Sequence, residues 1–216
     1  LLDEEGVSTV AQLEEMAANH DYAFDFLEDI PLGDYHRLEG YLFPDTYTFY
    51  LGEDPLYVIN KMLVNFYNRM EDYFAQFTEE SQYSLHDIVI IASMIEKETD
   101  GEDYRDIASV IYNRLENTAA ETAGYLQIDA TLVYINGGNV PTDADREIDS
   151  PYNTYLYQGL PAGPISNPGM ESLYAAMNPN DTSYYYYVLN PETGRHDFSR
   201  TYAEHQAKVA QYANNG

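Results

Sequence analysis

The segment from Leu85 to about Thr99 constrains the fold more than any other part of the chain, because it is apolar on nearly every side. Its apolar residues are Ile88, Val89, Ile90, Ile91, Ala92, Met94 and Ile95. Ser84 is followed three residues later by Asp87, which resembles a capping box with Asp in the usual place of Glu or Gln. The pattern therefore predicts a helix that begins after Ser84 and is buried on most of its sides.

Further helices are predicted on either side of this segment. The strongest periodic signal follows Asp54-Pro55, a typical helix start, and continues with apolar steps of three and four to Phe77. Shorter helices are predicted at 7–19, 104–115, 167–177 and 199–212. Residues 184–189 are rich in Tyr and predict a strand, whereas 125–135 fits a strand or a helix equally. We expect an α+β fold in which several helices pack on a small, mostly antiparallel sheet.

Composition excludes several classes of function. The chain of 216 residues has 37 Asp and Glu against 10 Lys and Arg, a net charge of −27. Such a surface repels phosphate, so we expect no nucleic-acid partner, and it also disfavours anionic lipid. The chain has no Cys, which excludes disulfides, thiolate metal sites and cysteine nucleophiles. Its five His are scattered without a metal-binding spacing, and we expect neither a metal nor a cofactor.

Glu96 is the first candidate for chemistry, because it lies at the end of the apolar helix. A carboxyl group held against an apolar face is partly desolvated, and desolvation favours its protonated form. A protonated carboxyl is what a general acid needs to cleave a glycosidic bond. The alternative is that Glu96, Lys97 and Glu98 form an ordinary solvated, charged helix end.

The Pro- and Gly-rich loop at 150–169 is the second candidate. Tyr152, Asn153 and Tyr155 offer hydroxyl groups, an amide and stacking faces that suit contact with sugar or peptide. The alternative is a rigid surface turn.

Three other residues are weaker candidates. Gln127 and Asp129 would share one face of a strand, and they could equally be ordinary surface residues. His196 follows the turn after the Tyr-rich strand, and a lone His in such a place is more often structural than catalytic.

Five ordered motifs resemble one known family, the YceG-like endolytic murein transglycosylases. The resemblance runs from about residue 24 to residue 212, nearly the whole chain. The matching stretches are Leu38–Tyr47, Ala92–Glu98, Val110–Leu115, Ser150–Gly169 and the set Gly194, His196 and Phe198. One departure is Ala130, which stands where the family has Pro, and residues 117–124 look like a small insertion.

The resemblance implies an enzyme that cuts nascent peptidoglycan strands internally, between MurNAc and GlcNAc, and leaves a 1,6-anhydroMurNAc end. Its catalytic residue would be Glu96, the first Glu of the E-K-E triplet. Glu96 would protonate the glycosidic oxygen and then take the proton of the MurNAc C6 hydroxyl, so no second carboxylate is needed. The candidates for substrate binding are Gln127, Asp129, Tyr152, Asn153, Tyr155, Asn167 and His196.

The resemblance also implies a domain division and a location. Residues 1–37 would be the end of a LysM-like, helical N-terminal segment, and 38–216 would be the catalytic domain. The start of the chain is neither a signal peptide nor an initiator Met, and no run approaches the ~20 apolar residues of a membrane span. We therefore expect an extracytoplasmic fragment of a protein that is anchored in the cell membrane through a missing N-terminal helix. The partners would be glycan strands, with cell-wall synthases as candidates. The rival hypothesis is a non-catalytic peptidoglycan-binding module.

Overall fold

The computed structural model describes residues 1–78, 80–99 and 101–213. Over these residues the chain forms seven α-helices and one antiparallel pair of strands, an α+β fold as predicted. The elements are α1 (Val10–Asn19), α2 (Pro55–Met70), α3 (Leu85–Glu98), α4 (Tyr104–Glu116), α5 (Asp129–Ile135), α6 (Met170–Met177), β1 (Tyr186–Asn190), β2 (Arg195–Ser199) and α7 (Tyr202–Ala213). None of these helices combines the length and the apolar character needed to cross a membrane.

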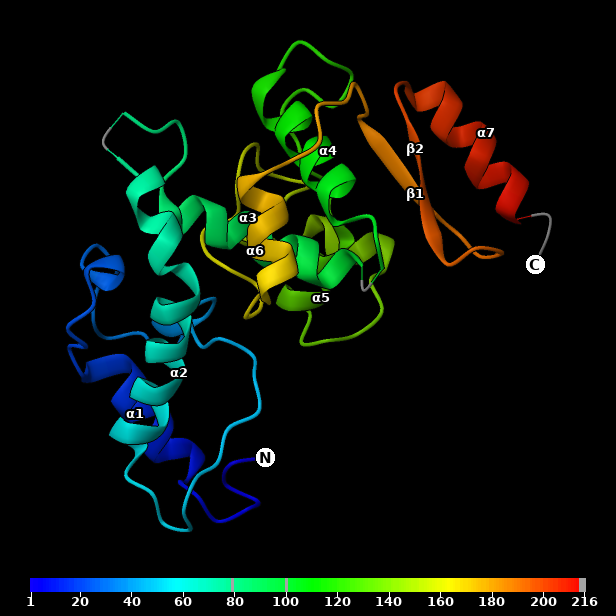
Figure 1. Cartoon of the computed structure of the whole chain (residues 1–216). Coiled ribbons are helices and arrows are strands. Elements are labelled where there is room, and N and C mark those ends of the chain that lie inside the picture. The colour runs from blue at the N-terminus through cyan, green and yellow to red at the C-terminus, as the bar shows by residue number, and fades with distance from the viewer. Residues whose placement is uncertain (79, 100, 214–216) are drawn as a thin grey trace.

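Helix α3 lies at the centre of the molecule, and α4, α5 and α6 pack around it (Figure 1). Helices α1 and α2 form one end of the molecule, and the sheet with α7 forms the other (Figure 1). The sheet packs on α7 and on α4, and α4 thereby connects it to α3 and α6. A two-stranded sheet is too small to organise a core of this size, which explains its place at the edge.

The predicted burial of α3 is confirmed. All eight residues from Ile88 to Ile95 are buried. The predicted capping box is also present, because Ser84 Oγ accepts a hydrogen bond from Asp87 N at 3.1 Å and Asp87 Oδ2 accepts one from Ser84 N at 2.8 Å. The start of α3 is thus fixed by local hydrogen bonds and its length by packing.

Two other segments refine the sequence-based expectations. The long helix ends as an α-helix at Met70 and continues as a 3-10 helix over Glu71–Gln76. In the undecided segment 125–135, the chain is irregular up to Ile128 and then forms α5. Gln127 has a left-handed φ of 50° and Asp129 opens α5, so the expectation that these two residues share a strand face is wrong.

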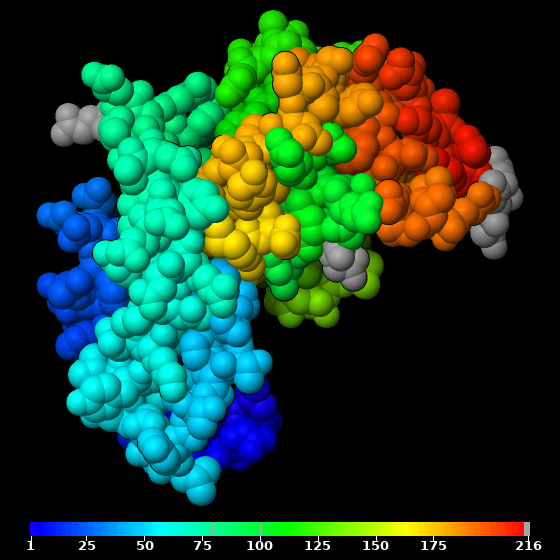
Figure 2. Space-filling view, in the orientation of Figure 1, coloured from blue at the N-terminus to red at the C-terminus, as the bar shows by residue number. Residues whose placement is uncertain are grey.

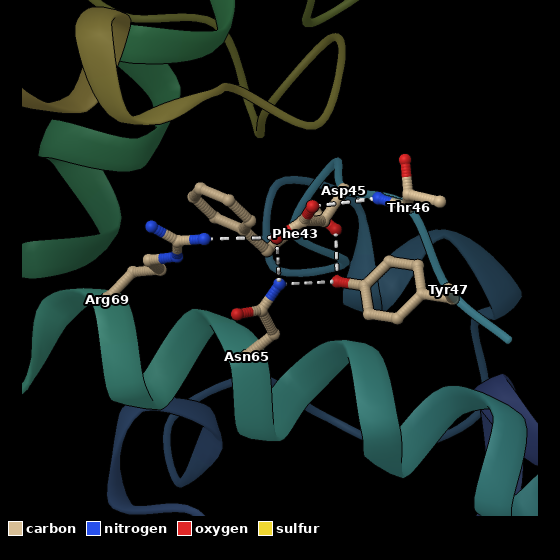
Figure 3. Close-up of polar contacts among 6 residues, drawn as sticks. All are labelled: Phe43, Asp45, Thr46, Tyr47, Asn65 and Arg69. Atoms are coloured by element: carbon tan, nitrogen blue, oxygen red, sulfur yellow. Dashed lines mark hydrogen bonds and ion pairs between the residues drawn. The ribbon is translucent and has the colours of Figure 1, made fainter.

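The loop at 38–47 is fixed to α2 by side-chain hydrogen bonds (Figure 3). Asp45 Oδ2 accepts from Asn65 Nδ2 at 3.0 Å and from Arg69 Nη2 at 3.1 Å. The Tyr47 hydroxyl accepts from Asn65 Nδ2 at 2.9 Å and donates to the Phe43 carbonyl at 2.6 Å. These residues therefore hold the loop against the helix.

Gly40 lets the same loop approach α3 closely. It has a φ of +90°, and a Cβ there would lie 2.5 Å from Val89 Cγ1 and 2.7 Å from Pro164 Cγ. We expect Gly40→Ala to lower the free energy of unfolding by about 2–4 kcal/mol, through backbone strain and overpacking together. Urea denaturation measures this loss. Gly52→Ala is the matched control, because Gly52 also has a positive φ but nothing lies within 4 Å of its added Cβ. An equal loss in both variants would contradict the role of close packing.

His86 makes the fold sensitive to acid. Its Nδ1 lies 2.7 Å from the hydroxyl of Tyr41, a fully buried residue. Burial lowers the pKa of His86, and the nearby Asp87 only partly opposes this. Between the unfolded pKa of about 6.5 and the lower folded value, the unfolded chain binds more protons, so stability falls as the pH falls.

We therefore expect the free energy of unfolding of the wild type to fall relative to that of His86→Gln between about pH 7 and pH 5. Comparing the two proteins removes the contribution of the many other carboxylates. Urea denaturation at several pH values measures this difference, and parallel curves for the two proteins would contradict the prediction.

Candidate active site

Glu96 lies in the last turn of α3, half-buried, with its carboxyl group directed at the start of α6. Its Oε2 accepts a hydrogen bond from Gly169 N at 3.0 Å and another from Ser172 Oγ at 2.6 Å. Within the described part of the chain, Oε1 has no hydrogen-bond partner. One oxygen is therefore held in place while the other is available to a ligand, so Glu96 is not an ordinary solvated helix end.

Ser93 positions the chain segment that faces Glu96. It lies three residues before Glu96 and so on the same side of α3. Its Oγ accepts from Ile165 N at 3.0 Å, and its carbonyl accepts from Ser166 Oγ at 2.9 Å. Together with the bond from Gly169 to Glu96, these contacts fix the 165–169 segment along the end of α3.

Two cavities flank this segment. The larger, of about 820 Å³, is lined by the loop at 42–49, by residues near the N-terminus and by Asn167. The smaller, of about 460 Å³, is lined by Lys97, Glu98, residues of α5 and Ile165. Figure 2 shows the N-terminal part, in blue and cyan, projecting away from the rest, with the outline indented between them. The 165–169 segment, which is bonded to α3 beside Glu96, thus contributes Ile165 to one cavity and Asn167 to the other.

Glu98 is a second carboxyl group at the end of α3, and like Glu96 it is half-buried. Burial raises its pKa, although its hydrogen bond from the Tyr187 hydroxyl, at 2.9 Å, acts in the opposite direction. The negative charge of Asp129 raises the pKa of Glu98 further. Glu98 therefore has the raised pKa that is expected of a carboxyl group held against an apolar face.

Asp129 and Tyr155 are brought together. The Tyr155 hydroxyl donates to Asp129 Oδ1 at 2.5 Å, and the guanidinium of Arg146 lies 5.1 Å from the centre of the Tyr155 ring. Asp129 lines the smaller cavity. Gln127 lies nearby in the chain with an exposed side chain, and its backbone N donates to the Thr154 carbonyl at 3.1 Å.

Asn153 and Asn167 are occupied by backbone groups. Asn153 is buried, and its Nδ2 donates to the carbonyls of Arg146 and Ile148 at 3.1 and 2.9 Å. Asn167 Oδ1 accepts from Gly40 N at 2.8 Å and from Leu42 N at 3.1 Å. Asn153 therefore shapes the loop, and Asn167 ties the 38–47 loop to the segment beside Glu96.

The contacts of Tyr152 and His196 are with residues other than Glu96. Tyr152 packs on Tyr134, with 4.9 Å between ring centres, and lines a separate cavity that includes His86. His196 lies in β2, where its Nδ1 is 3.2 Å from Asp103 Oδ2. Its ring meets that of Tyr187 edge-on at 5.4 Å, and the Tyr187 hydroxyl in turn donates to Glu98.

No group of three or more His, Asp or Glu side chains is arranged to hold a metal ion among the residues that the structure describes. The groups that contact Glu96 are a backbone N–H and a hydroxyl, both hydrogen-bond donors.

Comparison with known proteins matches these features to one family. The YceG-like family matches residues 4–211, nearly the whole chain. The chain belongs to the YceG-like family. A crystal structure of a yceG-like protein from Listeria monocytogenes has a TM-score of 0.73 and 34% identity, and the match covers 94% of this chain and 65% of that one.

Two curated relatives carry the name endolytic murein transglycosylase. One, from Bacillus subtilis (strain 168), is 38% identical over 180 residues, which are 82% of this chain and 48% of the relative. The other, from Streptococcus pneumoniae serotype 2 (strain D39), is 30% identical over 199 residues, 87% of this chain and 35% of the relative. The chain thus spans about half or less of these YceG-like proteins.

Sequence reasoning did not single out Ser93, Ser172, Glu98 or Tyr187. Ser93 could have been noticed as a polar residue within an apolar run. Ser172 and Tyr187 gave no such signal, because their contacts with α3 join residues more than 70 positions apart.

Proposed function

We propose that this chain carries the catalytic region of an endolytic lytic transglycosylase that cleaves peptidoglycan glycan strands between MurNAc and GlcNAc. The proposal rests on how the carboxyl group of Glu96 is bonded. Its Oε2 accepts hydrogen bonds from Gly169 N and Ser172 Oγ, while its Oε1 has no partner among the described residues. The names of the two curated relatives support the same class of reaction.

The proposed mechanism uses the Glu96 carboxyl group twice. Protonated Glu96 donates its proton to the glycosidic oxygen as the bond to the MurNAc anomeric carbon breaks. The resulting carboxylate then takes the proton of the MurNAc C6 hydroxyl, whose oxygen attacks that carbon. One proton is given and one is recovered, no water is consumed, and the product is a 1,6-anhydroMurNAc end.

The positive charge that develops at the anomeric carbon needs nearby electronegative groups. We assign this role to the side chain of Gln127, which precedes α5, and to Asp129 at the start of α5 with its partner Tyr155 from the 150–169 loop. Asn153 and Asn167 act by holding their loops, because their amide groups are bonded to backbone. Tyr152 and His196 would contact the substrate only further along the glycan strand.

The domain division, the membrane anchoring and the partners are also proposed from the family. Residues 1–37 would end a LysM-like segment and 38–216 would form the catalytic domain. The whole protein would be held at the cell membrane by an N-terminal anchor, with this region on the extracytoplasmic face and cell-wall synthases as candidate partners.

The length of glycan strands after incubation with the protein distinguishes an enzyme from a non-catalytic binding module. Uncrosslinked glycan strands with a fluorescent label at one end are incubated with the protein and separated by size. An endolytic enzyme shortens them by internal cuts, so labelled products of many lengths appear early. Strands that are bound but keep their full length would overturn the proposal and favour the binding module.

A further inference from the structure

The smaller of the two cavities that flank the 165–169 segment carries a positive charge, Lys97, that has no partner among the residues that the structure describes. Of the ten Lys and Arg in the sequence, eight donate to a carboxylate or a backbone carbonyl: Arg37, Lys61, Arg69, Arg105, Arg114, Arg146, Arg195 and Lys208. In the part of the chain that the structure describes, only the side chains of Lys97 and Arg200 have no such partner. Lys97 lines the cavity and is exposed, whereas Arg200 lies just before α7.

The carboxyl groups next to Lys97 do not neutralise it by contact. Glu98 Oε2 accepts from the Tyr187 hydroxyl, and Asp129 Oδ1 accepts from the Tyr155 hydroxyl. Burial also raises the pKa of Glu98, which reduces the negative charge that Lys97 would meet. As far as the described residues go, the ammonium group of Lys97 can therefore bind an anion from outside the chain.

The rest of the cavity is suited to a short peptide. Its walls include the apolar side chains of Val133, Pro141 and Ile165 and the ring of Tyr134. Its volume of about 460 Å³ lies within the range of small-ligand sites. An apolar wall with one cation at its edge fits a chain of small residues that ends in, or bears, a carboxylate.

We propose that this cavity binds the peptide stem of the glycan substrate, and that Lys97 recognises a stem carboxylate. The inference rests on the proposed function, because the stem is attached to the same MurNAc residue on which Glu96 acts. Lys97 follows Glu96 directly in the chain, so a stem that leaves the sugar beside Glu96 has only a short distance to this cavity. Lys97 is thus a specificity residue, which selects strands with charged stems.

Paired substrates test the proposal. One is an uncrosslinked strand with its natural stems, and the other is the same strand with its stem carboxylates converted to primary amides. We expect the wild type to cleave the natural strand with a kcat/KM about fivefold higher, mainly through a lower KM. The preference should shrink when NaCl is raised from about 50 to about 500 mM, because salt screens an exposed charge pair.

Substitutions of Lys97 test whether this residue causes the preference for natural stems. Lys97→Gln should bring the ratio of the two kcat/KM values close to one, and Lys97→Arg should restore it. Any effect of the substitution on Glu96 itself moves both rates together and leaves the ratio unchanged. Arg200→Gln is the matched control, since it removes the other cation that has no partner in the described part of the chain, outside this cavity, and it should keep the wild-type ratio.

The outcomes separate the two proposals. Equal cleavage of both strands by the wild type, or an unchanged ratio in Lys97→Gln, would overturn the role of Lys97 and leave the proposed function standing. Failure of the wild type to cleave any strand would overturn the proposed function and this inference with it. Amidase-stripped strands carry only the lactyl carboxylate, and a Lys97-dependent preference for them would overturn the assignment to the stem.

Discussion

Glu96→Gln should lower the rate of glycan cleavage by at least about 1,000-fold. General acid–base catalysis by one group contributes about 10²–10⁴, and here the same group serves in both proton transfers. The fold should not change, because the amide oxygen of Gln can accept the bonds that Gly169 N and Ser172 Oγ now make to Glu96 Oε2. Turnover of uncrosslinked strands measures the loss, and the urea midpoint checks the fold.

Glu171→Gln is the matched control for this experiment. Glu171 lies between Gly169 and Ser172 in the chain, but its side chain is exposed. The same loss of one negative charge should leave cleavage near the wild-type rate. A similar loss in both variants would point to a general charge effect, and a fully active Glu96→Gln would remove Glu96 from the mechanism.

Arg114→Ala should have the largest effect on stability. Arg114 is buried on α4, where its guanidinium donates to the Leu126 carbonyl and, at 2.7 Å, to the Tyr185 carbonyl. It also lies 5.4 Å from the centre of the Tyr186 ring. The substitution leaves two carbonyl groups without their hydrogen-bond donor. It also opens a gap between α4, β1 and the segment around Leu126. We expect a loss of about 3–5 kcal/mol in the free energy of unfolding.

Urea denaturation of Arg114→Ala and of Arg195→Ala tests this expectation. Arg195 pairs with Glu102 at an exposed position, where an ion pair contributes at most about 1 kcal/mol. If Arg114→Ala were no less stable than Arg195→Ala, Arg114 would not hold the sheet to the helices as we infer.

The helices could be predicted from the sequence because their signals are local. The capping box at Ser84, the Asp54-Pro55 start and the apolar periodicity each lie within a few residues of the element that they define. The segment 125–135 could not be decided, because the irregular stretch up to Ile128 depends on bonds to Thr154. Hydrogen bonds between residues so far apart in the sequence leave no periodic pattern in either segment.

The candidate site was only partly predictable for the same reason. Glu96 stands out as a carboxyl group at the end of an apolar helix, and the family motifs point to the same residue. Its donors, Gly169 and Ser172, lie more than 70 residues further along, where nothing in the sequence marks them as partners of Glu96. Motif residues such as Asn153 look equally suited to substrate binding, and their role in holding the loop becomes clear only from their bonds to backbone carbonyls.

The mass of the newly formed strand ends tests the central claim most directly. Uncrosslinked strands are digested with the wild type and with Glu96→Gln, and the products are analysed by mass spectrometry. If Glu96 directs attack by the MurNAc C6 hydroxyl, every new wild-type end lacks the elements of one water relative to a reducing end, and Glu96→Gln forms no such ends. New reducing ends from the wild type would mean that water is the nucleophile, and would contradict the proposed reaction.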